Sequence, residues 1–159
     1  ETAESVMGKA VVILGAGGAA RSIDATLVAE GASSVWIVNR SKERGEEVCR
    51  AIGASGTAPM HPEVLDILDV AVDLVVNTLP PEAEATVGSL DLTPLGDHAM
   101  LVDINYYLRN PALLERATAA GLLAFDGRGM FLWQAALSFE HWTGELPDIG
   151  LGRRVLRMD

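Results

Sequence analysis

Short apolar runs alternate with longer stretches of helical periodicity along most of the chain. Uninterrupted apolar runs of this kind are typical of strands that are buried on both faces of a parallel sheet. A weaker run at 55–58 could add one more strand. Strands are predicted at Ala10–Leu14, Ser34–Val38, Asp73–Asn77, Met100–Ile104 and Leu122–Phe125.

The segments between these runs have helical spacing. Ala20, Ile23 and Leu27 recur on one helical face, and Gly31 then supplies a left-handed stop. Alternating strands and helices predict an α/β protein, with a three-layer, Rossmann-like, doubly wound and mostly parallel sheet. Helices are predicted at Gly18–Glu30, Lys42–Ile52, Pro62–Leu68, Pro111–Ala120, Met130–Trp142 and Pro147–Arg157.

Length and charge narrow the class of protein. The 159 residues suit a single domain, 1–159, and the net charge of −10 argues against nucleic acid or an anionic membrane as a partner. No apolar run could cross a bilayer, no signal peptide precedes the first strand, and Cys49 has no cysteine to pair with. We therefore expect a cytoplasmic protein. Because the chain begins at Glu1 without a methionine, we interpret it as part of a longer polypeptide.

A glycine-rich turn directly follows the first predicted strand. The residues Gly15, Ala16, Gly17, Gly18, Ala19 and Ala20 match G-x-G-x-x-A between a strand and a helix, the context that a dinucleotide-binding turn requires. Gly15 permits the tight turn and Gly17 a close approach of the pyrophosphate, while the helix N-terminus attracts phosphate. A glycine-rich turn without a ligand is the alternative.

The end of the second predicted strand indicates which dinucleotide is bound. An NAD enzyme usually has a carboxylate there, but this chain has Asn39, Arg40 and Ser41, followed by Lys42 and Arg44. Guanidinium groups match the geometry of a phosphate, so this segment favours NADP over NAD as the cofactor. Ser41 could instead only cap the next helix, with the basic residues in solvent, and the two interpretations are compatible.

With these features placed, the chain resembles the NADP-binding half of shikimate dehydrogenase over nearly its whole length. Five segments carry the resemblance in the same order. They are 15–20, Asn39-Arg40-Ser41 with Arg44, Asn77-Thr78-Leu79-Pro80, Asp103 with Tyr106, and 126–130 leading to Gln134-Ala135-Ala136 and Trp142-Thr143-Gly144. The chain departs from the family pattern at Leu79, where a hydroxyl residue is usual, and at Glu82, where glycine is usual.

The resemblance implies an NADPH-dependent reduction of 3-dehydroshikimate to shikimate in a cleft between two domains. Residues 15–19 and 39–44 would hold the pyrophosphate and the adenosine phosphate. Tyr106 and Gln134 would reach the substrate. For Gln134 this agrees with its position, because a lone side-chain amide in an apolar helix needs a hydrogen-bond partner, which the substrate would supply. The nicotinamide side would be formed by Thr78, Leu79, Pro80, Ile104, Gly127 and Met130.

The family's catalytic lysine and aspartate belong to an N-terminal substrate domain, which we expect to be absent from this chain. Neither Lys9 nor Lys42 is suitably placed to donate a proton, and the three histidines lack metal or triad spacing. We therefore predict no catalytic residue and no metal, and expect the chain to bind cofactor without catalysing. The alternatives are a free-standing NADP-binding sensor, or a relative acting on quinate or aminoshikimate.

Overall fold

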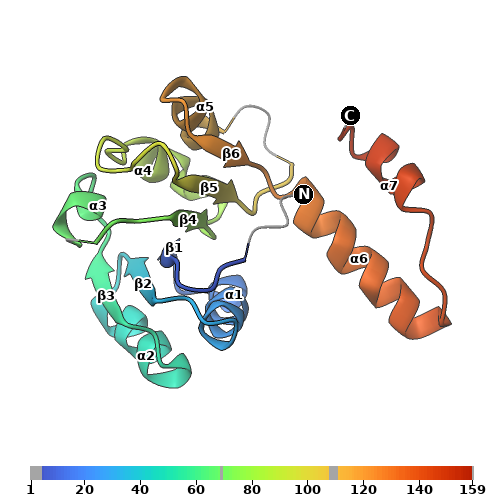
Figure 1. Cartoon of the computed structure of the whole chain (residues 1–159), viewed down its shortest axis with the longest axis horizontal. Coiled ribbons are helices and arrows are strands. Elements are labelled where there is room, and N and C mark those ends of the chain that lie inside the picture. The colour runs from blue at the N-terminus through green and yellow to red at the C-terminus, as the bar shows by residue number, and fades with distance from the viewer. Residues whose placement is uncertain (1–4, 69, 108–110, 159) are drawn as a thin grey trace.

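The computed structural model describes residues 5–68, 70–107 and 111–158. Within these ranges, strands form one sheet in the order β3-β2-β1-β4-β5-β6, and all neighbouring strands run parallel (Figure 1). This order, with a reversal at β1, confirms the doubly wound α/β prediction. The strands are β1 (Ala10–Leu14), β2 (Ser34–Asn39), β3 (Gly56–Pro59), β4 (Leu74–Asn77), β5 (Met100–Asp103) and β6 (Leu123–Phe125).

All the predicted helices form, with small differences at their ends. Gly31 stops the first one as expected, because its φ of +81° is left-handed. The segment Pro81–Gly88 is a difference, since it contains two short helical turns that the sequence pattern did not predict. The helices are α1 (Gly18–Ala29), α2 (Lys42–Ile52), α3 (Val64–Ile67), the 3₁₀ helix η1 (Pro81–Ala83), α4 (Glu84–Gly88), α5 (Ala112–Ala119), α6 (Arg128–Thr143) and α7 (Ile149–Val155).

Two hydrophobic layers enclose the sheet. Val11 and Ile13 of β1 belong to the cluster that includes buried residues of α1, whereas Val12 and Leu14 belong to the cluster with α3, α4 and α5. Both clusters are built on alternate residues of the same strand because successive strand side chains point to opposite faces. The central strands are therefore buried on both sides, as the uninterrupted apolar runs indicated.

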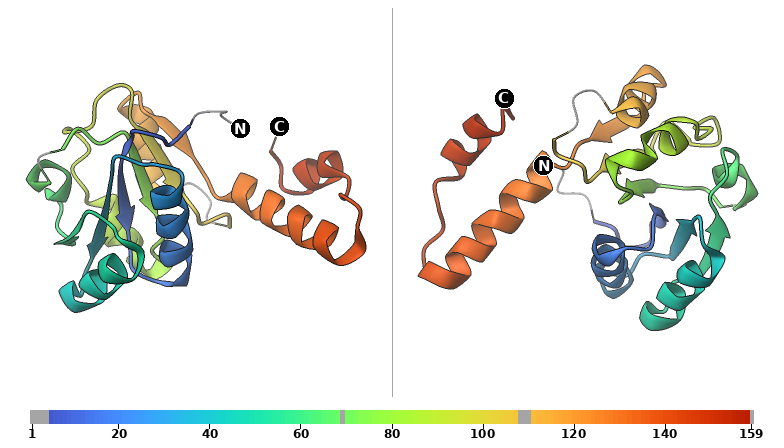
Figure 2. Two further views of the ribbon diagram at one scale, coloured as in Figure 1. Left: turned by 60° about the horizontal axis from the view of Figure 1, so that its bottom comes forward. Right: turned by 180° about the vertical axis from the view of Figure 1, so that it is seen from behind.

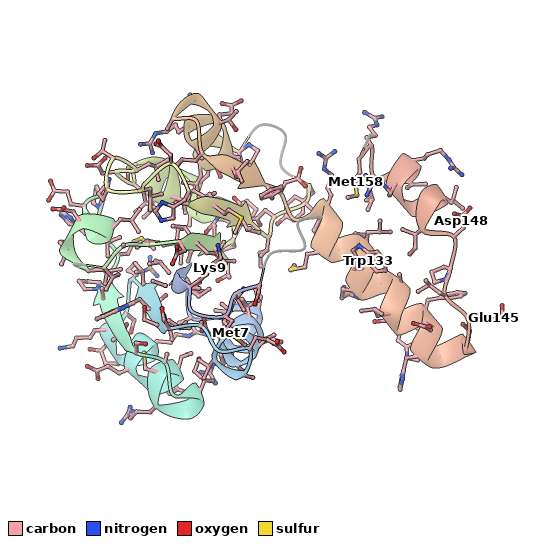
Figure 3. All side chains as sticks on the ribbon, in the orientation of Figure 1. Met7, Lys9, Trp133, Glu145, Asp148 and Met158 are labelled. Carbon is pink, nitrogen blue, oxygen red and sulfur yellow. The ribbon has the colours of Figure 1, made fainter. Side chains whose placement is uncertain are left out.

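Helices α6 and α7 lie beyond the edge of this three-layer body (Figure 2). The Arg128 guanidinium joins them, because it donates hydrogen bonds to the carbonyl oxygens of Leu156 and Arg157 after α7. Met158 lies near the first turn of α6, as Figure 3 shows. Much of the apolar surface of this pair is exposed, and its exposed large apolar residues are Met130, Leu137, Phe139, Trp142, Leu151 and Val155.

Candidate functional site

The glycine turn lies at the carboxyl edge of the sheet, between β1 and α1. Gly15 has a φ of +115°, and its amide donates a hydrogen bond to the carbonyl oxygen of Val38 at 2.8 Å. A Cβ atom at Gly15 would lie 2.6 Å from the Thr78 hydroxyl oxygen, so only glycine fits there. Gly17 is the N-cap of α1, without a side-chain cap, and no acidic residue lies in the first helical turn. The first amides of α1 are thus available to an anion.

The segment after β2 forms the second wall of the site. Ser41 is the N-cap of α2, and its hydroxyl oxygen accepts a hydrogen bond from the Arg44 amide at 3.3 Å. The same hydroxyl donates to Glu43 at 2.8 Å, and the Asn39 side-chain amide donates to the Ser41 carbonyl oxygen. Hydrogen bonds from the Glu43 backbone amide and then from Ser41 lower the pKa of Glu43. Ser41 therefore does cap the helix, as one of our two interpretations required.

The basic side chains of this segment divide into two groups. Lys42 lies 3.8 Å from Glu46 on the next turn of α2 and does not line the cleft described below. Arg40 and Arg44 do line it, and their guanidinium groups make no hydrogen bond or ion pair with any residue that the structure describes. Two unpaired guanidinium groups beside a capping hydroxyl form a site that suits a phosphate monoester.

The two walls and the loop after β4 enclose a cleft of about 510 Å³. The sequence interpretation missed four of its lining residues: Met60, Glu82, Ala83 and Thr86. Met60 follows a strand that the sequence indicated only weakly, and the other three belong to the unpredicted helical turns. The predicted residues that line the cleft are Gly15, Ala16, Gly17, Asn39, Arg40, Ser41, Arg44, Thr78, Leu79 and Pro80.

The remaining predicted cofactor residues lie outside this cleft. Gly18 and Ala19 are exposed at the start of α1. Ile104 and Gly127 contact each other, because a Cβ atom at Gly127 would collide with the Ile104 carbonyl group. Met130, in the first turns of α6, is 45% exposed. The β5–α6 junction is therefore tightly built, while the Met130 side chain projects into solvent.

The two predicted substrate residues lie apart from the cleft as well. The Tyr106 ring stacks on Phe131 with centroids 4.2 Å apart, and it lines a different cavity of about 810 Å³ together with Asp126 and Arg128. Gln134 is exposed on α6, with its amide nitrogen 3.5 Å from the Ser138 hydroxyl oxygen. In solvent the amide needs no buried partner. The substrate roles of both residues stay predictions.

Other kinds of site have little support in the part of the chain that the structure describes. That part contains no group of three or more histidine, cysteine or acidic side chains able to hold a metal ion. None of its helices has the length and apolar character needed to cross a bilayer. Cys49 donates to the Gly56 carbonyl oxygen, and burial, followed by the nearby charge of Asp24, raises the pKa of its thiol. This thiol is suited to a structural role.

Sequence comparisons give consistent matches. The family model "Shikimate / quinate 5-dehydrogenase" matches residues 1–105, and "Shikimate 5'-dehydrogenase C-terminal domain" matches residues 127–157. Shikimate dehydrogenase (NADP(+)) of Geobacter sulfurreducens is 37% identical over 153 residues, which cover 92% of this chain and 54% of that protein. The protein of the same name from Mesorhizobium japonicum is 38% identical over 146 residues, 91% of this chain and 52% of that protein. The chain thus spans about half the length of these curated relatives.

Solved structures resemble the fold over nearly the whole chain. Shikimate dehydrogenase from Thermus thermophilus, in complex with NADP(H) and shikimate, has 29% identity and a TM-score of 0.77 over 96% of this chain and 56% of that chain. Ligand-free 5-ketofructose reductase from a Gluconobacter species has 26% identity and a TM-score of 0.81 over 98% of this chain and 58% of that chain.

Proposed function

The chain belongs to the shikimate / quinate 5-dehydrogenase family, and from this premise we propose that it is the NADP(H)-binding part of an NADP-dependent shikimate dehydrogenase. The enzyme would interconvert 3-dehydroshikimate and shikimate in the shikimate pathway. The chain would bind and orient the nicotinamide cofactor, which supplies the hydride when bound. Curated relatives named for NADP(+), and a related structure in complex with NADP(H) and shikimate, support this assignment.

The observation that carries the proposal is the pair of guanidinium groups of Arg40 and Arg44, which have no partner among the described residues and lie opposite the uncapped N-terminus of α1. Residues 15–19 would receive the pyrophosphate at the N-terminus of α1. Arg40, Ser41 and Arg44 would bind the phosphate on the adenosine ribose, since all three line the same cleft as Gly15 and Gly17. This arrangement accounts for a preference for NADP over NAD, because NAD lacks that phosphate.

The far side of the cofactor would be held by the ends of β4 and β5 and the start of α6. Thr78, Leu79 and Pro80 line the cleft, and Ile104 with Gly127 forms the tight junction beyond it. We propose that the nicotinamide lies along these segments, with Met130 beside it. Tyr106 and Gln134 would then face the ring of shikimate from the same edge of the sheet.

We propose that the residues that transfer the proton lie outside this chain. Of its two lysines, Lys42 is paired with Glu46, and Lys9 directly precedes β1, at the opposite end of that strand from the glycine turn. The relatives are about twice as long as this chain. We propose that a substrate domain, corresponding to the part of the relatives that this chain does not cover, carries the catalytic lysine and aspartate. The exposed apolar surface of α6 and α7, with Trp142 79% exposed, would pack against that domain.

Calorimetric titration of the chain with NADP⁺ and with NAD⁺ tests the cofactor assignment. A charge-assisted contact to phosphate contributes about 1.5–3 kcal/mol, so we expect at least about tenfold tighter binding of NADP⁺. The double variant Arg40→Gln/Arg44→Gln should remove that preference, and its affinity for NADP⁺ should depend less on salt than that of the unaltered chain. Lys42→Gln is the matched control, because it removes a positive charge from the same segment outside the cleft. Equal affinities for both cofactors in the unaltered chain would refute the assignment.

A substrate panel tests the proposed reaction. We expect the chain alone to bind NADP⁺ but to form no NADPH when shikimate is added. When the chain is joined to a substrate domain, we expect it to oxidise shikimate and form NADPH. Quinate and 5-ketofructose belong in the panel, because the family model includes quinate dehydrogenases and one structural relative reduces 5-ketofructose. Faster turnover of either compound than of shikimate or 3-dehydroshikimate would correct the substrate and leave the cofactor assignment intact.

A further inference from the structure

A buried polar cluster lies at the carboxyl ends of β4 and β5. Asn77 and Asp103 are the last residues of these strands and face each other in register. Asn77, Asp103 and Asn105 are 2%, 0% and 9% exposed. Polar side chains this deeply buried are costly unless they are hydrogen-bonded, so the bonds that they make indicate what the cluster holds in place.

Asp103 is the centre of this cluster. One carboxyl oxygen accepts a hydrogen bond from the Asn77 side-chain amide at 2.9 Å. The other accepts from the Asn105 backbone amide at 2.9 Å and from the Asn105 side-chain amide at 2.7 Å. All three partners are N–H donors. A carboxylate, which only accepts hydrogen bonds, satisfies every one of them. A side-chain amide at this position would place its own NH₂ group, a donor, opposite one of these donors.

The cluster binds the loop after β4 from two sides. The Asn77 side-chain oxygen accepts a hydrogen bond from the Leu79 amide at 3.1 Å, and the Asn105 side chain donates to the Leu79 carbonyl oxygen at 3.0 Å. Both backbone groups of Leu79 are thus held by side chains that are themselves held by Asp103. Leu79 lines the cofactor cleft, so the position of the cleft wall depends on this carboxyl group.

The same cluster reaches the other two segments that we assign to the nicotinamide side. The Ile104 amide donates to the Asn77 carbonyl oxygen at 3.1 Å, and the Gly127 amide donates to the Asn105 carbonyl oxygen at 3.4 Å. Gly127 has no room for a side chain against Ile104. Three loops that are distant in sequence therefore meet around one buried aspartate. On the adenosine side of the cleft, no described residue is hydrogen-bonded to Asp103.

We propose that Asp103 is a positioning residue, which, acting through Asn77 and Asn105, fixes the loops that receive the nicotinamide half of the cofactor. This inference rests on the proposed function. Asp103 itself is fully buried and does not line the cleft. Its effect should therefore be confined to the part of the ligand that these loops contact, and the adenosine half should bind as before.

The chain offers an exchange of side chains that separates positioning from general stability. Asp103→Asn sets two amide groups against each other, and Asn77→Asp sets two carboxyl groups against each other, so each single variant breaks the pair. The double variant Asn77→Asp/Asp103→Asn restores it. The carboxyl group at position 77 can accept from the Leu79 amide and from the new amide at position 103. The oxygen of that amide can still accept both bonds from Asn105.

Titrations with NADP⁺ and with adenosine 2′,5′-bisphosphate, which lacks the nicotinamide half, provide the test. The measured quantity is the ratio of the two dissociation constants in each variant. We expect both single variants to lower the advantage of NADP⁺ by about tenfold and the double variant to return it close to that of the unaltered chain. Asn105→Ala, which releases only the Leu79 carbonyl and one bond to Asp103, should lower it less, and it is the fallback if the single variants unfold.

The other outcomes overturn the inference in distinguishable ways. Equal weakening of both ligands in the single variants would mean that Asp103 serves stability alone. An unaltered chain that binds both ligands equally well would mean that these loops contribute nothing to nicotinamide binding, although the cofactor assignment would stand. An unaltered chain that binds neither ligand would refute the proposed function itself, and the positioning role with it.

Discussion

Replacing Asp24 should stabilise the protein at neutral pH. Asp24 is fully buried on α1, on the same helical face as Ala20 and Leu27, and neither of its carboxyl oxygens has a hydrogen-bond partner among the described residues. Burial raises its pKa from 3.8 to about 7. Asp24→Ala removes the carboxyl group and keeps a side chain that favours helix.

The sign and size of the effect follow from linkage. Well below pH 3.8 the Asp24 carboxyl group is protonated in both the folded and the unfolded chain, and it imposes no charge penalty. Between pH 4 and 7 the unfolded chain loses this proton while the folded chain keeps it, so the free energy of unfolding falls as the pH rises. Since each unit of pKa corresponds to 1.36 kcal/mol, the loss above pH 7 has an upper limit of about 4 kcal/mol. Asp24→Ala would recover this stability, except that the small cavity left by alanine would cost about 1 kcal/mol.

Urea denaturation at pH 4.5, 6 and 8 measures this difference directly. We expect Asp24→Ala to be more stable than the unaltered chain by about 1–3 kcal/mol at pH 8, and the advantage to shrink towards pH 4.5. Asp66→Ala, at an exposed position on α3, is the control for removing one negative charge from a chain of net charge −10. A difference between Asp24→Ala and the unaltered chain that is constant across these pH values, or that grows towards acid, would refute the reasoning.

Three further predictions have equally specific outcomes. Gly127→Ala should lower the thermal midpoint, at a cost of about 2 kcal/mol or more, because its methyl group would collide with the Ile104 carbonyl. Gly129→Ala should be neutral or stabilising, because its methyl group would only come into van der Waals contact with the side chain of Met158, at 3.7 Å. Cys49 should react with a disulfide reagent at pH 8 more slowly than glutathione does, since its thiol pKa is raised, and a rate equal to that of glutathione would contradict this. Trp142→Ser should reduce the fluorescence of a bound hydrophobic dye without changing NADP⁺ affinity; unchanged dye binding would mean that this exposed surface is not an apolar docking face.

The fold could be predicted because its central signal is local. Every strand except β3 is a short apolar run, and the alternation of strands and helices with right-handed crossovers predicts a doubly wound parallel sheet. These rules allow more than one strand order, so the order β3-β2-β1-β4-β5-β6 is known from the structure alone. The segment 81–88 was missed because η1 and α4 are only three and five residues long, too short for a helical repeat. The weak run near residue 56 became a strand through pairing with β2, which no property of the run itself reveals.

The residues on the adenosine side of the candidate site could also be predicted from the sequence. The glycine turn and the segment 39–44 each directly follow a strand, and parallel neighbouring strands bring their carboxyl ends together. Met60, Glu82 and Thr86 reach the cleft only through tertiary packing, and no motif marks them. Glu82 is a departure from the family pattern, but only the structure shows that it lies in the cleft wall.

Asp24 and Asp103 show why the sequence cannot reveal the state of a buried carboxyl group. Both are acidic residues among apolar neighbours, and both are fully buried. Asp103 ends a strand, where the backbone of the next loop still has amide groups to donate, and it gains three donors. Asp24 lies in the middle of α1, where the helix itself uses the backbone amides, so only a side chain could donate and none in the described chain does. The place of an aspartate within its element therefore decides whether burial organises a site, as we propose for Asp103, or costs stability, as we predict for Asp24.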